Sequence, residues 1–219
     1  MIIDCIADLH GYYPELEGGD LLIVAGDLTA RDLRDEYIHF CRQIRHSGYK
    51  KIIVIAGNHD NLMQKEPEFF LSDEQVSYLC DSGTEFEGLK IWGSSWTRTF
   101  HGMNPKCKAF TCDTDEELSK KWSLIPNDTD ILITHSPPIA VLDKTTRNEF
   151  VGSISLSAQI GFLFNLKLHV FGHIHESYGK IDTPAYLPNY FDLCKHFSVN
   201  CSYVNQNYQP VNKPVRVIL

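Results

Sequence analysis

The sequence predicts an α/β fold in which strands of a buried sheet carry ligand-binding residues at their carboxyl ends. Three observations support this prediction. Short runs rich in Ile, Val and Leu recur along the chain, as in strands that are buried on both faces. A segment with helical spacing separates two of these runs. Each run is followed directly by Gly, Asp or His, and one of them also by Asn, at the positions where parallel sheets bind their ligands.

Five apolar runs are expected to form the main strands: Ile2–Ala7, Leu21–Ala25, Lys51–Ala56, Asp130–Thr134 and Lys167–Phe171. Residues 32–47 lie between the second and third runs and carry apolar side chains at helical spacing. Gly48 is typical of a helix stop. The order strand, helix, strand favours a layered α/β arrangement.

Two further helices are expected. Asp115–Leu124 is preceded by Thr114 as the N-cap, and Glu117 three residues later completes a capping box. Ser155–Asn165 is the second helix.

The remaining segments are expected to form short strands and loops. Ser82-Gly83 and Gly88 are expected to split the first three strands. The expected strands are Ser77–Cys80, Glu85–Glu87, Lys90–Trp92, Ser198–Tyr203 and Val215–Leu219, and the expected loops are Arg98–Cys112 and Asp182–Lys195.

Length and composition restrict the class of protein. The 219 residues suit one domain, 1–219. A net charge of -8 without clustered Lys and Arg disfavours duplex nucleic acid as a partner but leaves a small anionic ligand open. No apolar run approaches the ~20 residues of a membrane span, so no membrane association is expected. Seven cysteines without a CxxC pair, and no signal-like segment after Met1, favour a cytoplasmic protein with reduced thiols. The oligomeric state is left open between a monomer and a homodimer.

The polar residues after the strands form a pattern suited to metal ions. Asp8 and His10 are two apart at a strand end and share a face, and His173 and His175 repeat this spacing. Asp27 has two oxygens and can bridge two cations. The full candidate ligand set is Asp8, His10, Asp27, Asn58, His135, His173 and His175.

This mixture of carboxylate, amide and imidazole ligands suits divalent transition metals, with Mn expected first and Fe or Zn as alternatives. Two such ions ~3.5–4 Å apart hold a hydroxide and clamp a phosphoryl group. His59, next to Asn58, is assigned as general acid, a role worth ~10²–10⁴ in rate. Asp60 either orients His59 or caps the following helix, and the cap is favoured. Gly11, Gly26, Gly57 and Gly172 are expected where a side chain would block a turn or the metals.

Taken one at a time, these motifs are common turns or core histidines. Together and in order they resemble the calcineurin-like metallophosphoesterases, over positions 4 to about 205. The resemblance implies a four-layer α/β/β/α sandwich with metals at the strand ends. It implies that His59 is the acid and that two metal sites share Asp27. The first site would comprise Asp8, His10, Asp27 and His175, and the second Asp27, Asn58, His135 and His173.

Longer motifs most closely resemble the small metallophosphoesterase-domain-containing subfamily. The resemblance implies action on phosphodiesters and binding of purine nucleotides. Some members lack the first His of Gly-His-x-His and are inactive, whereas this chain has His173. The motifs are Ile91-Trp92-Gly93-Ser94-Ser95-Trp96, Lys121-Trp122-Ser123-Leu124-Ile125-Pro126, Thr134-His135-Ser136-Pro137-Pro138, Val170-Phe171-Gly172-His173-Ile174-His175-Glu176 and Asn205-Gln206-Asn207-Tyr208-Gln209-Pro210-Val211-Asn212.

The chain departs from the phosphoprotein phosphatases of the same family. Ala30 stands where those enzymes have the Asp that supports the catalytic His, and Asp60 stands where they have Glu. Arg31 either grips phosphate or lies exposed at a helix start, and the exposed position is favoured. A phosphoprotein substrate is therefore disfavoured.

The sequence thus predicts a metal-dependent phosphodiesterase acting on small, nucleotide-type diesters such as cyclic nucleotides. Alternatives are a phosphomonoesterase or nucleotidase, a catalytically weak nucleotide-binding scaffold and, disfavoured by the acidic charge, a nuclease. Four aromatic residues either stack on a base or fill the core, which is favoured: Trp92, Trp96, Phe100 and Phe110. Ser94, Ser95 and Asn104 are weaker candidates for substrate contacts. His101 and His196 are placed near the metals, and His169 in the core.

Overall fold

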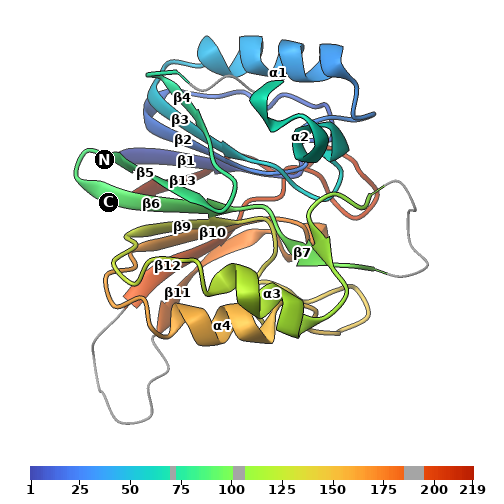
Figure 1. Cartoon of the computed structure of the whole chain (residues 1–219). Helices are drawn as coiled ribbons and strands as arrows, with labels where there is room; N and C mark the ends of the chain where they lie inside the picture. Colours follow the sequence, from blue (N-terminus) through green and yellow to red (C-terminus); the bar gives the residue numbers. More distant parts are fainter. Residues whose placement is uncertain (70–72, 101–106, 185–194) are drawn as a thin grey trace.

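Two β-sheets pack face to face, and helices cover their outer faces. This is seen in a computed structural model that describes residues 1–69, 73–100, 107–184 and 195–219. Figure 1 shows α1 and α2 over the first sheet and α3 and α4 over the second. The four layers, α/β/β/α, confirm the expected fold class.

The first sheet has five strands in the order β13-β1-β2-β3-β4. β1 to β4 run parallel, so their carboxyl ends meet at one edge, and β13 joins β1 antiparallel. The strands are β1 (Ile2–Ile6), β2 (Gly19–Ala25), β3 (Tyr49–Ile55), β4 (Val76–Tyr78) and β13 (Val215–Ile218).

The second sheet has six strands in the order β11-β12-β10-β9-β6-β5. Its four central strands are parallel, whereas the edge strands β5 and β11 are antiparallel to their neighbours. The strands are β5 (Ser82–Phe86), β6 (Leu89–Ser94), β9 (Ile131–Thr134), β10 (Leu168–Phe171), β11 (Gly179–Pro184) and β12 (Lys195–Asn200). A separate pair joins β7 (Thr97–Arg98) to β8 (Thr111–Cys112).

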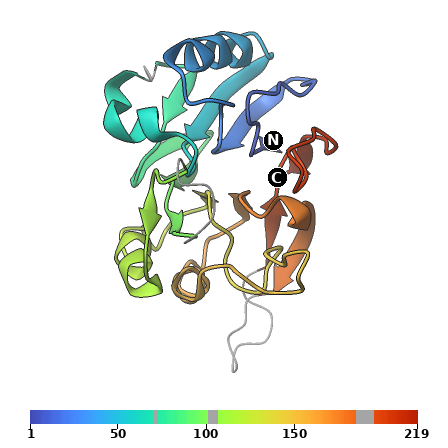
Figure 2. The ribbon, with the colours of Figure 1, turned by 90° about the vertical axis from the view of Figure 1, so that its right-hand side faces the viewer.

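The main core lies between the two sheets. Ile23 and Ile53 from the first sheet and Ile133, Val170 and Val199 from the second are fully buried in one apolar cluster. Burying each such side chain contributes about 1.5–3 kcal/mol. This packing fixes the two sheets against each other, and with them the strand ends that carry the polar residues. Figure 2 shows the two sheets stacked in a view turned by 90° from that of Figure 1.

The helices follow the sequence pattern closely. α1 (Arg34–Arg45) buries Tyr37, Phe40 and Ile44 at the expected spacing. α3 (Asp115–Trp122) begins after Thr114, whose side chain forms the expected capping box with Glu117. The shorter segments are α2 (Asn61–Lys65), α4 (Ile154–Ile160) and the 3₁₀ turns η1 (Pro67–Phe69) and η2 (His175–Ser177). Across the described ranges, no helix combines the length and apolar character that crossing a membrane requires.

Several boundary predictions were wrong. β12 spans Lys195–Asn200 and not Ser198–Tyr203. Ser82-Gly83 lies inside β5, because Gly83 pairs with Trp92 across the hairpin. α4 ends at Ile160, five residues early, with Gly161 as its C-cap. The two expected loops include Arg98 of β7, all of β8 and residues 182–184 of β11. Tertiary pairing stabilises these strands without a marked sequence period.

Candidate metal centre

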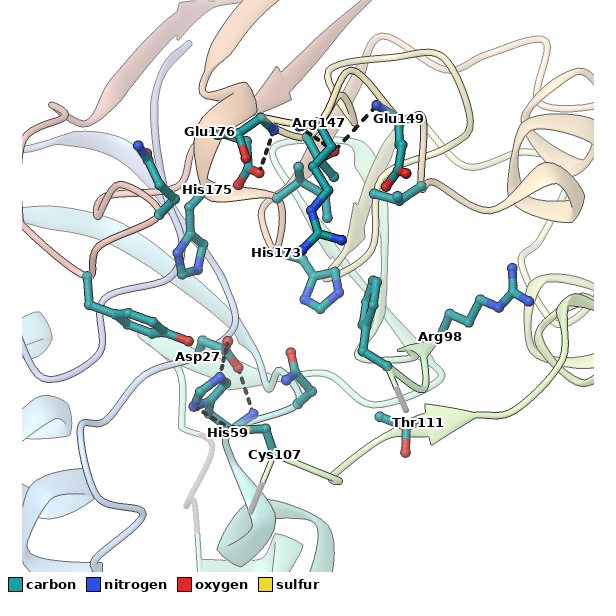
Figure 3. A pocket seen from close by; sticks show the side chains of 18 residues that line it. Asp27, His59, Arg98, Cys107, Thr111, Arg147, Glu149, His173, His175 and Glu176 are labelled. Carbon is teal, nitrogen blue, oxygen red and sulfur yellow. Dashed lines mark hydrogen bonds and ion pairs between the residues drawn. The ribbon is translucent and has the colours of Figure 1, made fainter. Parts of the chain in front are cut away.

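The residues expected to bind metal meet where the carboxyl ends of the parallel strands of both sheets face each other. Figure 3 shows Asp27 and His59 on one side of a cavity and His173 and His175 on the other. The first sheet supplies Asp8 and His10 after β1, Asp27 after β2 and Asn58 after β3. The second supplies His135 after β9 and His173 and His175 after β10.

Asp27 lies at the centre of this group. Its Oδ2 atom is 3.5 Å from Nε2 of His135 and 3.8 Å from Nε2 of both His10 and His59. The carboxylate is almost fully buried at 1% exposure. This is the position that a ligand shared by two cations requires.

Two groups of candidate ligands flank Asp27. On one side, His175 Nε2 lies 3.6 Å from Asp8 Oδ1 and 3.3 Å from His10 Nε2. On the other, His135 Nε2 lies 3.0 Å from Asn58 Oδ1. Three sets of ligand atoms lie within 4.8 Å of one another: Asp8, His10 and His175; Asp8, Asp27 and His135; and His10, Asp27 and His59.

Two buried atoms indicate that the group is built for cations. Asp8 Oδ1 and His173 Nε2 have no hydrogen-bond partner within the described part of the chain. A buried polar atom without a partner costs about 1–3 kcal/mol, which a bound cation would offset. Burial also lowers the pKa of His173 to about 3 and that of His10 to about 4, so both rings stay neutral, as metal ligands must be.

The buried carboxylates and imidazoles of the site shift one another's pKa values. Burial alone would lower the pKa of His135, but the Asp27 carboxylate outweighs it and raises this pKa to about 9. Burial likewise opposes ionisation of Asp8, yet His175 keeps the pKa of this carboxyl below its usual value. Carboxylates that attract protons onto neighbouring histidines will attract divalent cations in the same way.

The backbone at the ligands is strained. Asp8, His10, Asp27 and His173 have φ angles of 50°, 44°, 55° and 69°, in the left-handed region that side chains disfavour. Each such residue costs about 1–2 kcal/mol. Residues held in such conformations cluster at functional sites.

Neighbouring glycines make room for the ligands, as expected. A Cβ atom on Gly57 would lie 2.3 Å from Asp27 Oδ1, and one on Gly172 would lie 2.3 Å from Asp8 Oδ2. Any side chain at either position would therefore displace a carboxylate.

Asp60 has a different role from the one expected. It occupies the N-cap position of α2, but its side chain makes no capping hydrogen bond to the described residues of that helix. Instead, the buried carboxylate accepts hydrogen bonds from the backbone N–H groups of Gly57, Asp27 and Leu28 and from the Tyr37 hydroxyl. Burial and the nearby Asp27 raise its pKa to about 7. Asp60 thus ties the Asp27 turn to the turn that carries Asn58.

Several supporting residues gave no signal as site residues when considered alone. The Ser202 hydroxyl donates to Asp8 Oδ2 at 2.5 Å, and the backbone carbonyl of Asn205 lies 3.2 Å from Nδ1 of His175. The Tyr208 ring lies against the imidazole of His10, with 4.7 Å between ring centroids. Only the resemblance of the tail motif pointed to Asn205 and Tyr208.

The cavity beside the ligands has a volume of about 500 Å³. Arg98, Phe100 and Arg147 are among its lining residues. Figure 3 shows Arg98 and Arg147 on the side of the cavity away from Asp27. Phe100 is 38% exposed, and its ring centroid lies 5.3 Å from that of His173. The expectation that the aromatics fill the core is therefore wrong for Phe100.

The other aromatic residues and serines pack as structural residues. Trp92, Trp96 and Phe110 belong to the apolar clusters, as expected. Ser94 and Ser95 are fully buried, which excludes direct contact with substrate in this conformation.

The remaining expectations fall away from the ligands. Arg31 is exposed just before α1, as favoured, and pairs with Glu36 in the first turn of that helix. His169 is fully buried, as expected, whereas His196 lies near the amino end of β12, away from the ligand-bearing strand ends. His101 and Asn104 lie outside the described residues.

Comparison with known proteins agrees with this geometry. Metallophosphoesterase domain-containing protein 1 of Homo sapiens is 33% identical over 98% of this chain and 70% of its own length. The UPF0046 protein T07D4.2 of Caenorhabditis elegans is 31% identical over 96% of this chain and 58% of its own length. The crystal structure of TT1561 of Thermus thermophilus shares the fold, with a TM-score of 0.59, 16% identity, and coverage of 91% of this chain and 88% of the other.

A family model described as calcineurin-like phosphoesterase matches residues 1–177. The match includes every residue of the candidate centre from Asp8 to His175. By this match and the relatives above, the chain belongs to the calcineurin-like phosphoesterase family, whose members depend on two metal ions.

Proposed function

We propose that this protein is a two-metal phosphodiesterase that hydrolyses small phosphodiesters of nucleotide type, cyclic nucleotides among them. The observation that carries the proposal is the convergence of seven candidate ligands, two of them with unpartnered buried atoms, beside a cavity of about 500 Å³. A cavity of this volume suits a small molecule. Its described lining carries no cluster of basic residues of the kind that binds duplex nucleic acid.

The geometry supports a division of the ligands into two overlapping sets. Asp8, His10 and His175 lie on one side of Asp27. Asn58 and His135 lie on the other, where the His173 ring packs against that of His135 with 5.0 Å between ring centroids. We assign Asp27 to both sets. Manganese is the proposed metal, with iron or zinc as alternatives, because the ligands mix carboxylate, amide and imidazole groups.

His59 is the proposed general acid. When bound, the two cations would neutralise charge on the phosphoryl oxygens and lower the pKa of an attacking water. The His59 ring lines the cavity, and its backbone N–H donates to Asp27 Oδ1 at 2.9 Å. This bond fixes the start of the side chain beside the ligands. From there Nε2 can pass a proton to the leaving oxygen.

A phosphomonoesterase or nucleotidase is the second candidate. Arg98 and Arg147 line the cavity and form no ion pair with any described residue. Two guanidinium groups available to a ligand would favour a doubly charged phosphomonoester. Rates on a bis-aryl phosphate and a mono-aryl phosphate, measured with added Mn²⁺, separate the two candidates, and a strong preference for the monoester would overturn the diester proposal.

The setting proposed for this activity is the cytoplasm. The six cysteines in the described ranges are all free thiols, which suits a reducing compartment. The single domain, 1–219, stays a prediction from the sequence. The oligomeric state stays open between a monomer and a homodimer.

Two substitutions test the assignment. His59→Asn should keep both metals but lose ~10²–10⁴ in kcat, the usual worth of a general acid. Asp27→Asn should lose metal, and with it turnover, because the shared ligand is weakened. Metal content by elemental analysis and kcat by phosphate-ester hydrolysis check both. Equal metal loss in the two variants would show that His59 is a ligand instead, and a wild-type chain without metal or Mn²⁺-dependent turnover would favour a scaffold.

A further inference from the structure

The side chain of His59 has one neighbour that the proposed function leaves unexplained. Sγ of Cys107 lies 3.2 Å from Nδ1 of the His59 ring, and Figure 3 shows the thiol beside the ring. This distance is well within hydrogen-bond range for sulfur. Nε2, the other ring nitrogen, lies 3.8 Å from Asp27 Oδ2. The two ring nitrogens therefore face different surroundings, and the thiol holds the one farther from the candidate ligands.

The sequence explains why His59 needs such a neighbour. A histidine that transfers a proton is oriented by a group bonded to its other ring nitrogen. Ala30, which follows the Asp27 turn, carries only a methyl group and cannot supply a hydrogen bond. Asp60 follows His59 in the sequence and could also orient the ring, but its carboxylate accepts hydrogen bonds from backbone N–H groups of the neighbouring turns. Among the described residues, Cys107 is the hydrogen-bond partner of Nδ1.

Backbone contacts hold Cys107 in place. Two residues further on, the N–H group of Ala109 donates to the carbonyl oxygen of Asn58 at 3.2 Å. Ala109 is fully buried. Ala109 and Phe110 both belong to the apolar cluster that joins the first sheet to α1. The turn that carries His59 and the segment that carries Cys107 are thus tied together directly. The thiol contact follows from this backbone arrangement.

We propose that Cys107 is a positioning residue for His59, holding the ring so that Nε2 presents its proton to the leaving oxygen. This inference rests on the proposed role of His59. When the ring is neutral, the thiol donates to Nδ1 and leaves the proton on Nε2. When the ring is protonated, Nδ1–H donates to the sulfur, a weak acceptor, and Nε2–H still faces the cavity. As the P–O bond breaks, the leaving oxygen takes the electron pair of that bond and the proton from Nε2 of the protonated ring. The neutral ring that remains keeps its proton on Nδ1, which donates to the sulfur of Cys107.

Burial agrees with a neutral thiol at this position. It raises the pKa of Cys107 to about 12, and the carboxylates of Asp27 and Asp32 act in the same direction. A protonated thiol can donate, as the contact with a neutral ring requires.

The test compares Cys107→Ala, which removes the hydrogen bond, with Cys107→Ser, which keeps a donor and acceptor. On a diester with an alkoxide leaving group, Cys107→Ala should lose about tenfold in kcat, because small losses of orientation are costly. Its KM and metal content should stay at the wild-type values. With a nitrophenolate leaving group, which departs without a proton, the same variant should match wild type. Cys107→Ser should recover most of the loss on the alkoxide substrate.

A spectroscopic readout does not depend on turnover. In the zinc-loaded protein, ¹⁵N NMR of the His59 ring should show the tautomer protonated at Nε2, whereas Cys107→Ala should show a mixture of tautomers. Cys112→Ala is the matched control, because Cys112 lies five residues away on β8, and the thiol that contacts the His59 ring is that of Cys107. It should leave both readouts unchanged.

The outcomes separate this inference from the proposed function. If His59→Asn loses turnover but Cys107→Ala matches wild type on both substrates and keeps the tautomer, Cys107 has no positioning role. Equal losses on both substrates, or no rescue by Ser, would show a merely structural role and overturn the inference. If His59→Asn itself keeps full turnover, the proposed acid is wrong.

Discussion

The two walls of the cavity are built differently. The inner wall is formed by Asp27 and Asn58, which are backed by the fully buried Asp8 and His135. These side chains have at most 9% exposure and are held by buried hydrogen bonds. The outer wall, defined by Arg98, Phe100 and Arg147, consists of exposed side chains. Under the proposed function, the inner wall fixes the chemistry, which needs accurate placement of charge, and the outer wall selects what enters.

The largest effect is expected where the inner wall is tied together. Asp60→Ala would leave three buried N–H groups without their acceptor, which should lower the free energy of unfolding by at least about 3 kcal/mol. Metal affinity should fall about 10–100-fold, as for other residues that support ligands. Urea unfolding and metal titration measure the two losses.

Asp35→Ala is the matched control, because Asp35 is exposed on α1. It should change stability by no more than about 0.5 kcal/mol. If Asp60→Ala behaves like this control, the inner wall does not depend on buried bonds and the comparison fails.

A smaller effect is expected at the aromatic part of the outer wall. If a base stacks on the exposed ring, Phe100→Ala should raise KM for a cyclic nucleotide about fivefold, equivalent to about 1 kcal/mol of stacking. KM for a dialkyl phosphate should not change, nor should metal content. Steady-state kinetics on both substrates gives the answer.

Phe150→Ala serves as the control, since this exposed ring lies outside the cavity lining. If Phe100→Ala lowers kcat and leaves KM unchanged, Phe100 contributes to the reaction and not to the selection of substrate.

The smallest effect is expected at the exposed guanidinium of the outer wall. Arg147→Ala should raise KM about twofold for anionic esters, because exposed charge pairs are worth only about 0.2–1 kcal/mol. The increase should shrink at high salt. Arg42→Ala, on the exposed face of α1, should have no effect on KM. A loss of kcat in Arg147→Ala would place the guanidinium at the reacting phosphoryl group and favour the monoesterase candidate.

The same contrast explains what the sequence could predict. The ligands were predictable because Asp8 with His10, and His173 with His175, follow apolar strands directly, and parallel strands bring their ends to one edge. Asp60 was misjudged because its position before a helix is typical of a cap, whereas its partners on the Asp27 turn lie more than thirty residues away in the sequence.

Contacts of long sequence separation account for the other differences. Ser202 reaches Asp8 across 194 residues, and Cys107 reaches His59 across 48. A serine or cysteine has no distinctive spacing, so neither contact leaves a pattern in the sequence. β11 was missed for a related reason, since pairing with β12 defines it rather than its own composition.

The left-handed backbone at the ligands has a consequence for stability. Glycine adopts this conformation without penalty, so His10→Gly should destabilise the metal-free fold less than His10→Ala, although both remove the same imidazole. The native residues at such positions oppose the backbone preference of their own side chains. The molecule therefore gives up part of its folding free energy to keep a charged centre assembled before any ion arrives.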